Sequence, residues 1–458
     1  MNAYIPNTKE DQEKMLSFIG LKDIGELFSC IPDEVLLSNK LSLESSKSEF
    51  EVLKKVDALA KKNRPASEMT CFLGAGVYDR LIPSVIKHII GRQEFLTAYT
   101  PYQPEISQGT LQAIFEFQTM VCSLFGMDTA NASLYDGASS CAEAMLLAVG
   151  HTGEKRLLVS NLLHPEARDV VLSYARYNGI VVEFIPEKDG LTDLTALEEM
   201  IKGDAAGVLI QTPNFLGGIE DLASAAEIAH REKALLLSYT ADLMSLALIE
   251  SPGACGADIA VGEGQSFGIG MNFGGPHLGL MAVKQPFTRK LPGRIVGQTK
   301  DVSGKRAYTL TLQTREQHIR REKATSNICT NQNLNALAFT CYLSLLGTEG
   351  LLEAASQSYT KAHYLKDALS RIGVKPFNNA PFFCEFAATL PVPAKKVAGE
   401  LLKEGYLLGL PLSDWLKTIG KVDADDGTVL FCVTEKRTKE EIDSFTELVG
   451  QVCDRLRR

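Results

Sequence analysis

The sequence predicts an α/β protein, with a mostly parallel sheet covered by helices on both faces and a smaller α+β domain after it. Short apolar runs of strand length alternate with helical patterns between residues 155 and 283, and further strand-like runs follow near the C-terminus. The central runs are apolar throughout, which is typical of parallel strands buried on both faces. At 458 residues the chain is long enough for two or three folded units.

The composition argues against several classes of protein. Hydrophobic residues make up 45% and charged residues 22%, as in ordinary soluble globular proteins. A net charge of −9 without a basic block argues against nucleic-acid binding. The ten cysteines form no C-x-x-C pair, so we expect no zinc or other metal site and a reducing setting. The polar, acidic start and the absence of a membrane-length apolar run predict a cytoplasmic protein without membrane association.

Residues 1–65 are predicted to form a helical arm, ahead of a large α/β domain over 66–330 and a small α+β domain over 331–458. Asn7 and Thr8 precede an acidic stretch, as expected where a helix begins. The arm either wraps a partner or covers the main domain, and its sequence is compatible with both.

The large domain is expected to begin near Cys71. Apolar spacing from Leu81 to Ile89 predicts a helix. The prolines at 101 and 104 hold the next segment extended, and Ser107 is expected to cap the helix that follows. A later helix opens at Gly137-Ala138-Ser139-Ser140, and the free amides of such a start can bind an anion, although many helix starts bind nothing.

The extended segment carries four polar and aromatic residues that are candidates for lining a cleft: Tyr99, Tyr102, Gln103 and Glu105. The alternative is a loop whose tyrosines pack at the surface.

The central part of the chain alternates between strands and helices. Strands are expected over 156–160, 180–185, 205–211 and 234–239. Helices are expected over 165–176, 194–201 and 221–232. Because ligands of such sheets bind at the carboxyl ends of the strands, residues 211–214 and 239–242 and the loop that follows are expected at one edge.

A glycine-rich loop joins two apolar runs, 257–261 and 278–283. Its glycines stand at positions 262, 264, 268, 270, 274 and 275. Glycine permits close approach of the backbone to a ligand, but it equally marks a tight turn at a subunit interface. The spacing is not that of a dinucleotide-binding loop. No lysine or arginine lies between Lys233 and Lys284, so the loop offers no amine for a Schiff base.

The remaining chain predicts a linking segment and the small domain. Residues 291–332 are rich in Arg, Thr, Gln and Asn, and a helix follows from Asn335. Strands are expected over 382–388, 406–412 and 428–434, with a helix over 394–405.

Five motifs occur together: YTPYQPEISQG (99–109), LYDGASSCAEA (134–144), QTPNFLGGIED (211–221), FGGPHLGLMAV (273–283) and REKATSNICTNQ (321–332). With them the chain resembles the glycine dehydrogenase (decarboxylating) family, the P-protein of the glycine cleavage system, over essentially its whole length. Some members are one chain of about twice this length, and others are split into two subunits. This chain is similar to the first, or alpha, subunit.

The resemblance implies an aspartate-aminotransferase-like fold, that is, fold type I of the pyridoxal-phosphate-dependent transferases. It also implies the reaction: glycine loses carbon dioxide on pyridoxal phosphate, and the aminomethyl group passes to the lipoyl arm of the H-protein. The implied partners are the beta subunit, in an assembly of two alpha with two beta, and the lipoylated H-protein.

The chain departs from the family pattern at the cofactor. In the cofactor-bearing subunit a lysine precedes Thr-Phe, and alignment on Ser266-Phe267 puts Gln265 at the lysine position. An amide cannot form an imine. Tyr239 stands about where an aspartate would pair with the pyridine nitrogen, with Asp242 as a doubtful shifted substitute. The resemblance therefore implies that pyridoxal phosphate sits on the beta subunit.

By analogy with aminotransferase-type dimers, this chain is expected to complete the beta-subunit site. Thr325, Ser326 and Asn327 are the first candidates, as donors to a phosphate, and Arg321 and Lys323 would hold their loop or meet the H-protein. The second candidates are Tyr99, Tyr102, Gln103 and Glu105. For both sets the alternative is packing at the subunit interface.

Two histidines and two other functions complete the expectations. His164 is expected to cap a helix or lie at the surface rather than stack on a cofactor ring, and His277 is assigned no chemistry. One alternative is a self-sufficient enzyme that uses Lys284 or Lys323. The other is a structural or regulatory partner that only stabilises the beta subunit.

Overall fold

The computed structural model describes residues 7–37, 41–324, 326–421 and 425–458. The chain divides into two units, Met1–Arg64 and Pro65–Arg458, and each is described by itself. In these described ranges no helix is long and apolar enough to cross a membrane. The domain boundaries expected at 65/66 and 330/331 stay predictions.

The first unit contains short helical segments joined by irregular chain in its described residues. It contains α1 (Lys9–Phe18), the 3-10 turn η1 (Ile24–Phe28) and α2 (Glu49–Ala60). Thr8 caps α1 through a reciprocal pair of hydrogen bonds with Asp11, and Ser48 caps α2 in the same way with Glu51. No residue of α1 or α2 is buried.

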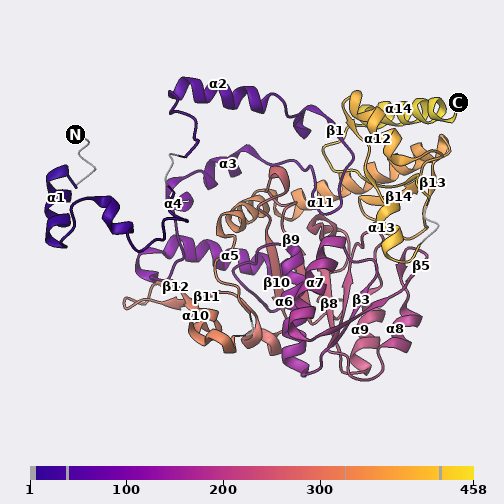
Figure 1. Ribbon diagram of the computed structural model, residues 1–458. Coiled ribbons are helices and arrows are strands. Elements are labelled where there is room, and N and C mark those ends of the chain that lie inside the picture. The colour runs from indigo at the N-terminus through magenta and orange to yellow at the C-terminus, as the bar shows by residue number, and fades with distance from the viewer. Residues whose placement is uncertain (1–6, 38–40, 325, 422–424) are drawn as a thin grey trace. The chain divides into compact units, whose positions relative to one another are not determined.

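A mostly parallel sheet forms the centre of the second unit (Figure 1). Within the described residues its spatial order is β2 (Thr129–Ala130), β10 (Gly279–Val283), β9 (Ile259–Glu263), β8 (Leu235–Thr240), β7 (Gly207–Gln211), β3 (Arg156–Ser160) and β4 (Val181–Ile185). From β9 to β4 all neighbours are parallel, and β10 runs antiparallel to both β9 and β2. The strand runs predicted from the sequence are confirmed.

Helices cover both faces of this sheet because the strands are largely apolar and successive side chains point to opposite faces. Leu235 and Leu237 pack into one cluster, which includes α6 and α7, whereas Leu236 packs into the other, which includes α5, α8 and α9. These helices are α5 (Gln108–Phe125), α6 (Gly137–Thr152), α7 (Pro165–Asn178), α8 (Leu194–Met200) and α9 (Leu222–Arg231). Ser107 precedes α5 as predicted, but its side chain makes no capping hydrogen bond.

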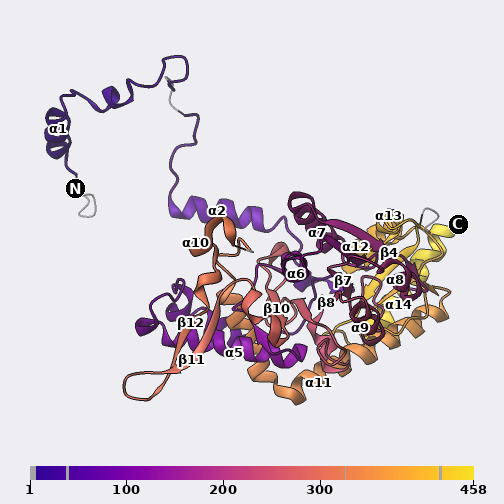
Figure 2. The same ribbon diagram turned by 90° about the horizontal axis from the view of Figure 1, so that it is seen from below.

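Short elements join these layers. They are η2 (Ala66–Glu68), α3 (Ser84–Ile90), α4 (Gln93–Leu96), η3 (Pro104–Ile106), β5 (Glu187–Lys188), β6 (Leu191–Thr192), η4 (Leu243–Ala247), η5 (Asn272–Gly274), η6 (Gln285–Lys290), β11 (Ile295–Lys300), β12 (Arg306–Thr311), η7 (Gln313–Arg315), α10 (Gln317–Arg320) and η8 (Arg321–Lys323). The antiparallel hairpin of β11 and β12 projects outward in both views (Figures 1 and 2).

The C-terminal part begins with α11 (Asn333–Arg371), which is kinked at Gly347. An antiparallel sheet follows, in the order β13 (Lys375–Pro376), β14 (Glu385–Thr389), β17 (Thr428–Cys432) and β16 (Leu410–Pro411). The helices are α12 (Ala394–Lys403), α13 (Ser413–Thr418) and α14 (Lys439–Arg457). β1 (Thr70–Cys71) pairs in parallel with β15 (Tyr406–Leu407), so the start of the second unit is built into this part.

The single strand predicted over 406–412 is wrong in detail, because two short strands, β15 and β16, take its place. Gly409 separates them at a φ of +137°, and a Cβ atom there would lie 2.6 Å from the carbonyl oxygen of Leu430. Only glycine permits this turn against a neighbouring strand. In the same part of the fold, the rings of Phe72 and Phe445 stack with centroids 3.9 Å apart.

Candidate functional site

A cleft of about 590 Å³ lies at the carboxyl ends of the parallel strands, the edge predicted for a ligand. The strands and the helix start around it supply its polar side chains. These include Asp136 before α6, His164 after β3, Tyr239 near the end of β8, Glu263 at the end of β9 and His277 before β10. The glycine-rich loop lies between β9 and β10, as predicted.

The anion site expected at the start of α6 is taken by carboxylates of the chain itself. The Gly137 N–H donates to Oε2 of Glu263 at 2.9 Å, and the Ser139 N–H donates to Oδ1 of Asp136 at 2.7 Å. Oε1 of Glu263 accepts from the N–H groups of Gln265 and Leu278, both at 3.0 Å. A second anion here would meet two fixed negative charges and find these donors used.

Gln265 is a structural residue of the loop. Its Oε1 accepts from the Tyr78 N–H at 2.9 Å, and its Nε2 donates to the carbonyl oxygens of Tyr78 at 3.2 Å and Ile269 at 3.0 Å. The side chain is 1% exposed and does not line the cleft. The amide thus ties the loop to the segment before α3, a role that needs both a donor and an acceptor.

Tyr239 and Asp242 take separate roles. Tyr239 is buried against α6, where a Cβ atom on Gly137 would lie 2.7 Å from its hydroxyl oxygen. Asp242 is also buried, but its carboxylate pairs with Arg80 and accepts from the Met244 N–H at 3.3 Å. Asp242 does not line the cleft, so the structure gives no support to its role as a shifted ring partner.

The two histidines lie together in the cleft. His164 caps α7 as predicted, since its Nδ1 accepts from the Glu166 N–H at 3.2 Å. Its Nε2 lies 3.0 Å from the carbonyl oxygen of Ala75, and burial lowers the pKa of His164. His277 Nδ1 lies 3.3 Å from Oε2 of Glu263, and this hydrogen bond raises the pKa of His277 although burial opposes it.

The described residues among those predicted to serve a partner's site do not line this cleft. Tyr99, Gln103 and Glu105 are exposed. The Tyr102 hydroxyl accepts from Nη2 of Arg294 at 2.9 Å.

Among the first candidates, Asn327 is exposed and Ser326 Oγ accepts from the Ile328 N–H at 3.0 Å. Thr325 lies outside the described residues. Sequence reasoning missed Glu263, although its place between two glycines at a strand end was the available signal. It also missed Glu143, which nothing local distinguishes from an exposed helix residue.

Glu143 is a buried carboxyl group on α6, within hydrogen-bonding reach of Ser326. Burial raises its pKa from 4.5 to about 7, and a hydrogen bond with Ser326 opposes this only in part. The folded protein binds the proton of Glu143 more tightly than the unfolded chain does. Protonated Glu143 therefore contributes its full stabilisation of the fold below pH ~4.5, and this contribution is lost as pH rises through about 7.

We therefore expect ionisation of Glu143 to lower the free energy of unfolding of the wild type by on the order of 3 kcal/mol between pH 5 and 8. The Glu143→Gln variant cannot ionise there, so it should not show this decrease. Urea unfolding at both pH values measures it. Glu385 shares a pKa raised by burial to about 7, so part of the loss will remain in the variant. An identical pH dependence in wild type and variant would contradict the assignment to Glu143.

Three comparisons agree with this architecture. Residues 2–449 match the family model described as glycine cleavage system P-protein. A probable glycine dehydrogenase (decarboxylating) subunit 1 of Geobacillus kaustophilus is 49% identical over 451 residues, covering 98% of this chain and 99% of that protein. A crystal structure of glycine decarboxylase (P-protein) of the glycine cleavage system, in inhibitor-bound form, superposes with a TM-score of 0.87 at 44% identity, covering 98% and 99% of the two chains.

The fold is shared more widely. An alanine–glyoxylate aminotransferase from a Nostoc species superposes with a TM-score of 0.61 at 16% identity, covering 91% of this chain and all of that one. The sheet, its helices and the cleft at the strand ends therefore define a protein of the pyridoxal-phosphate-dependent transferase fold type I, as predicted. Within that class, the chain belongs to the glycine cleavage system P-protein family, which confirms the resemblance seen in the sequence.

The cleft of this chain does not fit pyridoxal phosphate. The residue aligned with the lysine is Gln265, and its side-chain amide is hydrogen-bonded to the backbone of Tyr78. The start of α6 already binds Glu263. Tyr239, near the end of β8, is a buried phenol rather than a carboxylate.

Proposed function

We propose that this chain is the cofactor-free alpha subunit of a two-subunit glycine decarboxylase in the cytoplasm. The complete enzyme decarboxylates glycine and passes the aminomethyl group to the lipoyl arm of the H-protein. Pyridoxal phosphate, held by a beta subunit in an assembly of two alpha with two beta, supplies the electron sink. The relatives' designation as subunit 1 supports a two-part enzyme.

The observation that best supports this proposal is the engagement of Glu263 and Gln265. Both side chains are at least 97% buried, and both use their polar atoms on the chain's own backbone. A cleft that has only lost a lysine would leave its phosphate site open. Here the anion site is filled as well, so the chain is built to be stable without the cofactor.

The first test is spectroscopic. The chain alone, mixed with pyridoxal phosphate, is expected to show no imine absorbance and no label after borohydride reduction. Together with its beta partner, the reducible band should appear on the partner only. A reduced, labelled lysine on this chain, at Lys284 or Lys323 for example, would instead support the self-sufficient enzyme.

We further propose that Tyr99, Tyr102, Gln103, Glu105, Thr325, Ser326 and Asn327 contribute to the site on the beta subunit. Asn327 is exposed, as a residue that serves a partner must be. Tyr102 is 43% exposed and is held by Arg294, which presents its ring in a fixed orientation.

Asn327→Ala is expected to lower the decarboxylation rate of the reconstituted complex at least about tenfold, the range for one lost charge-assisted hydrogen bond. Asn178→Ala, an exposed amide in the last turn of α7, is the matched control and should leave the rate unchanged. Sedimentation of the complex checks that the subunits still associate. Full activity of the Asn327 and Tyr102 variants would favour the alternative, a partner that only stabilises the beta subunit.

A further inference from the structure

A second cavity, of about 240 Å³, lies between α6 and the segments η6, η7 and α10, and shares no lining residue with the cleft. Four cationic side chains line it: Arg289, Lys290, Arg315 and Arg320. The carboxylate of Glu316 also lines it, 3.7 Å from Nε of Arg294 and 3.6 Å from Nδ1 of His318. The chain as a whole carries a net charge of −9, so this concentration of positive charge is local.

Neutral groups hold two of the four cations in place. Nζ of Lys290 donates to the carbonyl oxygen of Gly150 at 2.9 Å. Arg315 donates through Nε to the carbonyl oxygen of Leu312 and through Nη2 to that of Gly293, both at 3.0 Å. Carbonyl oxygens orient a cation without cancelling its charge, so both side chains are fixed and still positive.

The other two cations are free to bind a ligand. The side chains of Arg289 and Arg320 make no hydrogen bond or ion pair with any residue in the described ranges, and both residues are exposed. Four positive charges around one small cavity repel one another, and the single carboxylate in the lining, Glu316, already lies near Arg294 and His318, so a bound anion would relieve the repulsion that remains. A concave site with convergent polar groups is also the expected form of a small-molecule site.

We propose that this cavity binds a small oxyanion of the phosphate class, either the free ion or the phosphoryl group of a small metabolite. Arg289 and Arg320 present planar guanidinium groups, whose paired N–H donors match the oxygens of a phosphate. Lys290 and Arg315 supply fixed charge, and the Ser326 hydroxyl lines the same wall. A cavity of about 240 Å³ excludes a nucleotide-sized ligand. The site rests on its four cationic residues, none of which is proposed to serve the beta subunit, so it does not depend on the proposed subunit role.

Calorimetric titration of the full-length chain at constant ionic strength tests the proposal. Inorganic phosphate and glycerol phosphate are the two probes: binding of both indicates a phosphoryl-group site, and binding of phosphate alone indicates a site for the free ion. The double variant R289Q/R320Q is expected to raise the Kd at least about tenfold, since it removes two charged donors.

The matched control is R176Q/R231Q, which removes the same net charge from two exposed arginines on α7 and α9. It should bind phosphate with the wild-type Kd. The proposal is overturned if wild type binds neither probe, or if both double variants weaken binding equally, which would be an effect of net charge. Thermal melting of each variant establishes that it is folded, and R320Q alone, with a smaller but measurable loss, serves if the double variant is not.

Discussion

Replacing Arg80 by methionine is expected to lower the free energy of unfolding by about 3–5 kcal/mol, the largest single effect we anticipate in this chain. Arg80 lies on the segment before α3, where it is buried between Asp242 after β8 and Glu435 of the C-terminal part. Its Nη2 pairs with Asp242, its Nη1 lies 2.6 Å from Oε2 of Glu435, and Nη1 also donates to Oγ of Ser358 at 3.2 Å. Without the guanidinium, two largely buried carboxylates would remain uncompensated, and that loss outweighs the gain from an apolar side chain.

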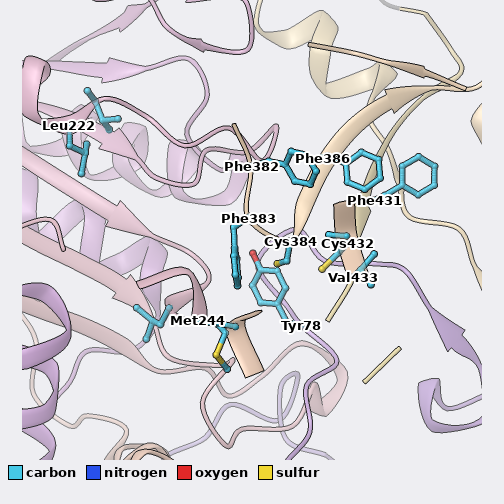
Figure 3. Packing of buried hydrophobic residues seen from close by; sticks show 14 of the residues in the cluster. Tyr78, Leu222, Met244, Phe382, Phe383, Cys384, Phe386, Phe431, Cys432 and Val433 are labelled. Carbon is cyan, nitrogen blue, oxygen red and sulfur yellow. The ribbon is translucent and has the colours of Figure 1, made fainter. Parts of the chain in front are cut away.

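The surroundings of Arg80 explain why water cannot replace it. Tyr78, two residues earlier, packs beside Cys384 among buried aromatic residues (Figure 3). Tyr78 is also the residue that Gln265 holds, and its hydroxyl donates to Oε2 of Glu385 at 2.9 Å. The loss of Arg80 should therefore loosen the contact between the central sheet and the C-terminal sheet rather than one local turn.

Urea unfolding of Arg80→Met beside Arg92→Met measures this effect. Arg92 forms an ion pair with Glu94 in which both side chains are more than half exposed, so its loss should leave the free energy of unfolding nearly unchanged. The double variant R80M/D242N should recover part of the stability, because it removes one of the two stranded charges. If Arg80→Met and Arg92→Met cost the same, the buried network contributes little.

The central sheet could be predicted because each of its strands is recognisable from a short stretch of sequence. Both faces of β8 are covered, so its consecutive residues Leu235, Leu236 and Leu237 are all apolar, and a continuous apolar run of this length is typical of such a strand. The helix starts at Thr8 and His164 could be predicted for the same reason, because capping uses neighbours within three residues. The double strand around Gly409 could not, since it depends on the carbonyl group of Leu430.

The sequence predicted where the candidate site lies but not which contacts its residues make. The edge of the sheet follows from strand order, and the missing lysine is visible in the sequence itself. That Glu263 occupies the start of α6 depends on residues 126 positions apart, and the contact between Gln265 and Tyr78 spans 187. No pattern of local residue spacing can predict contacts between residues so far apart in the sequence. The same holds for Arg80, whose two carboxylate partners lie in other parts of the fold.

Restoring the lysine, by Gln265→Lys, is expected to destabilise the protein by about 3 kcal/mol or more and to restore no imine with pyridoxal phosphate. The ammonium group would be buried beside the Tyr78 backbone, where it could donate to carbonyl oxygens, but the Tyr78 N–H would lose its acceptor. The cleft itself would be unchanged, since residue 265 does not line it and Glu263 would still occupy the α6 start.

Gln357→Lys is the matched control, because Gln357 is exposed on α11 one helical turn from Glu353 and a lysine there gains an ion pair. Urea unfolding and absorbance after borohydride reduction are measured on both variants. A stable Gln265→Lys protein that forms a reducible imine would mean that one substitution separates this chain from a cofactor-binding subunit. The expected result, an unstable protein without an imine, would mean that the loss of the cofactor has been built into the packing of the loop, the start of α6 and the segment before α3 together.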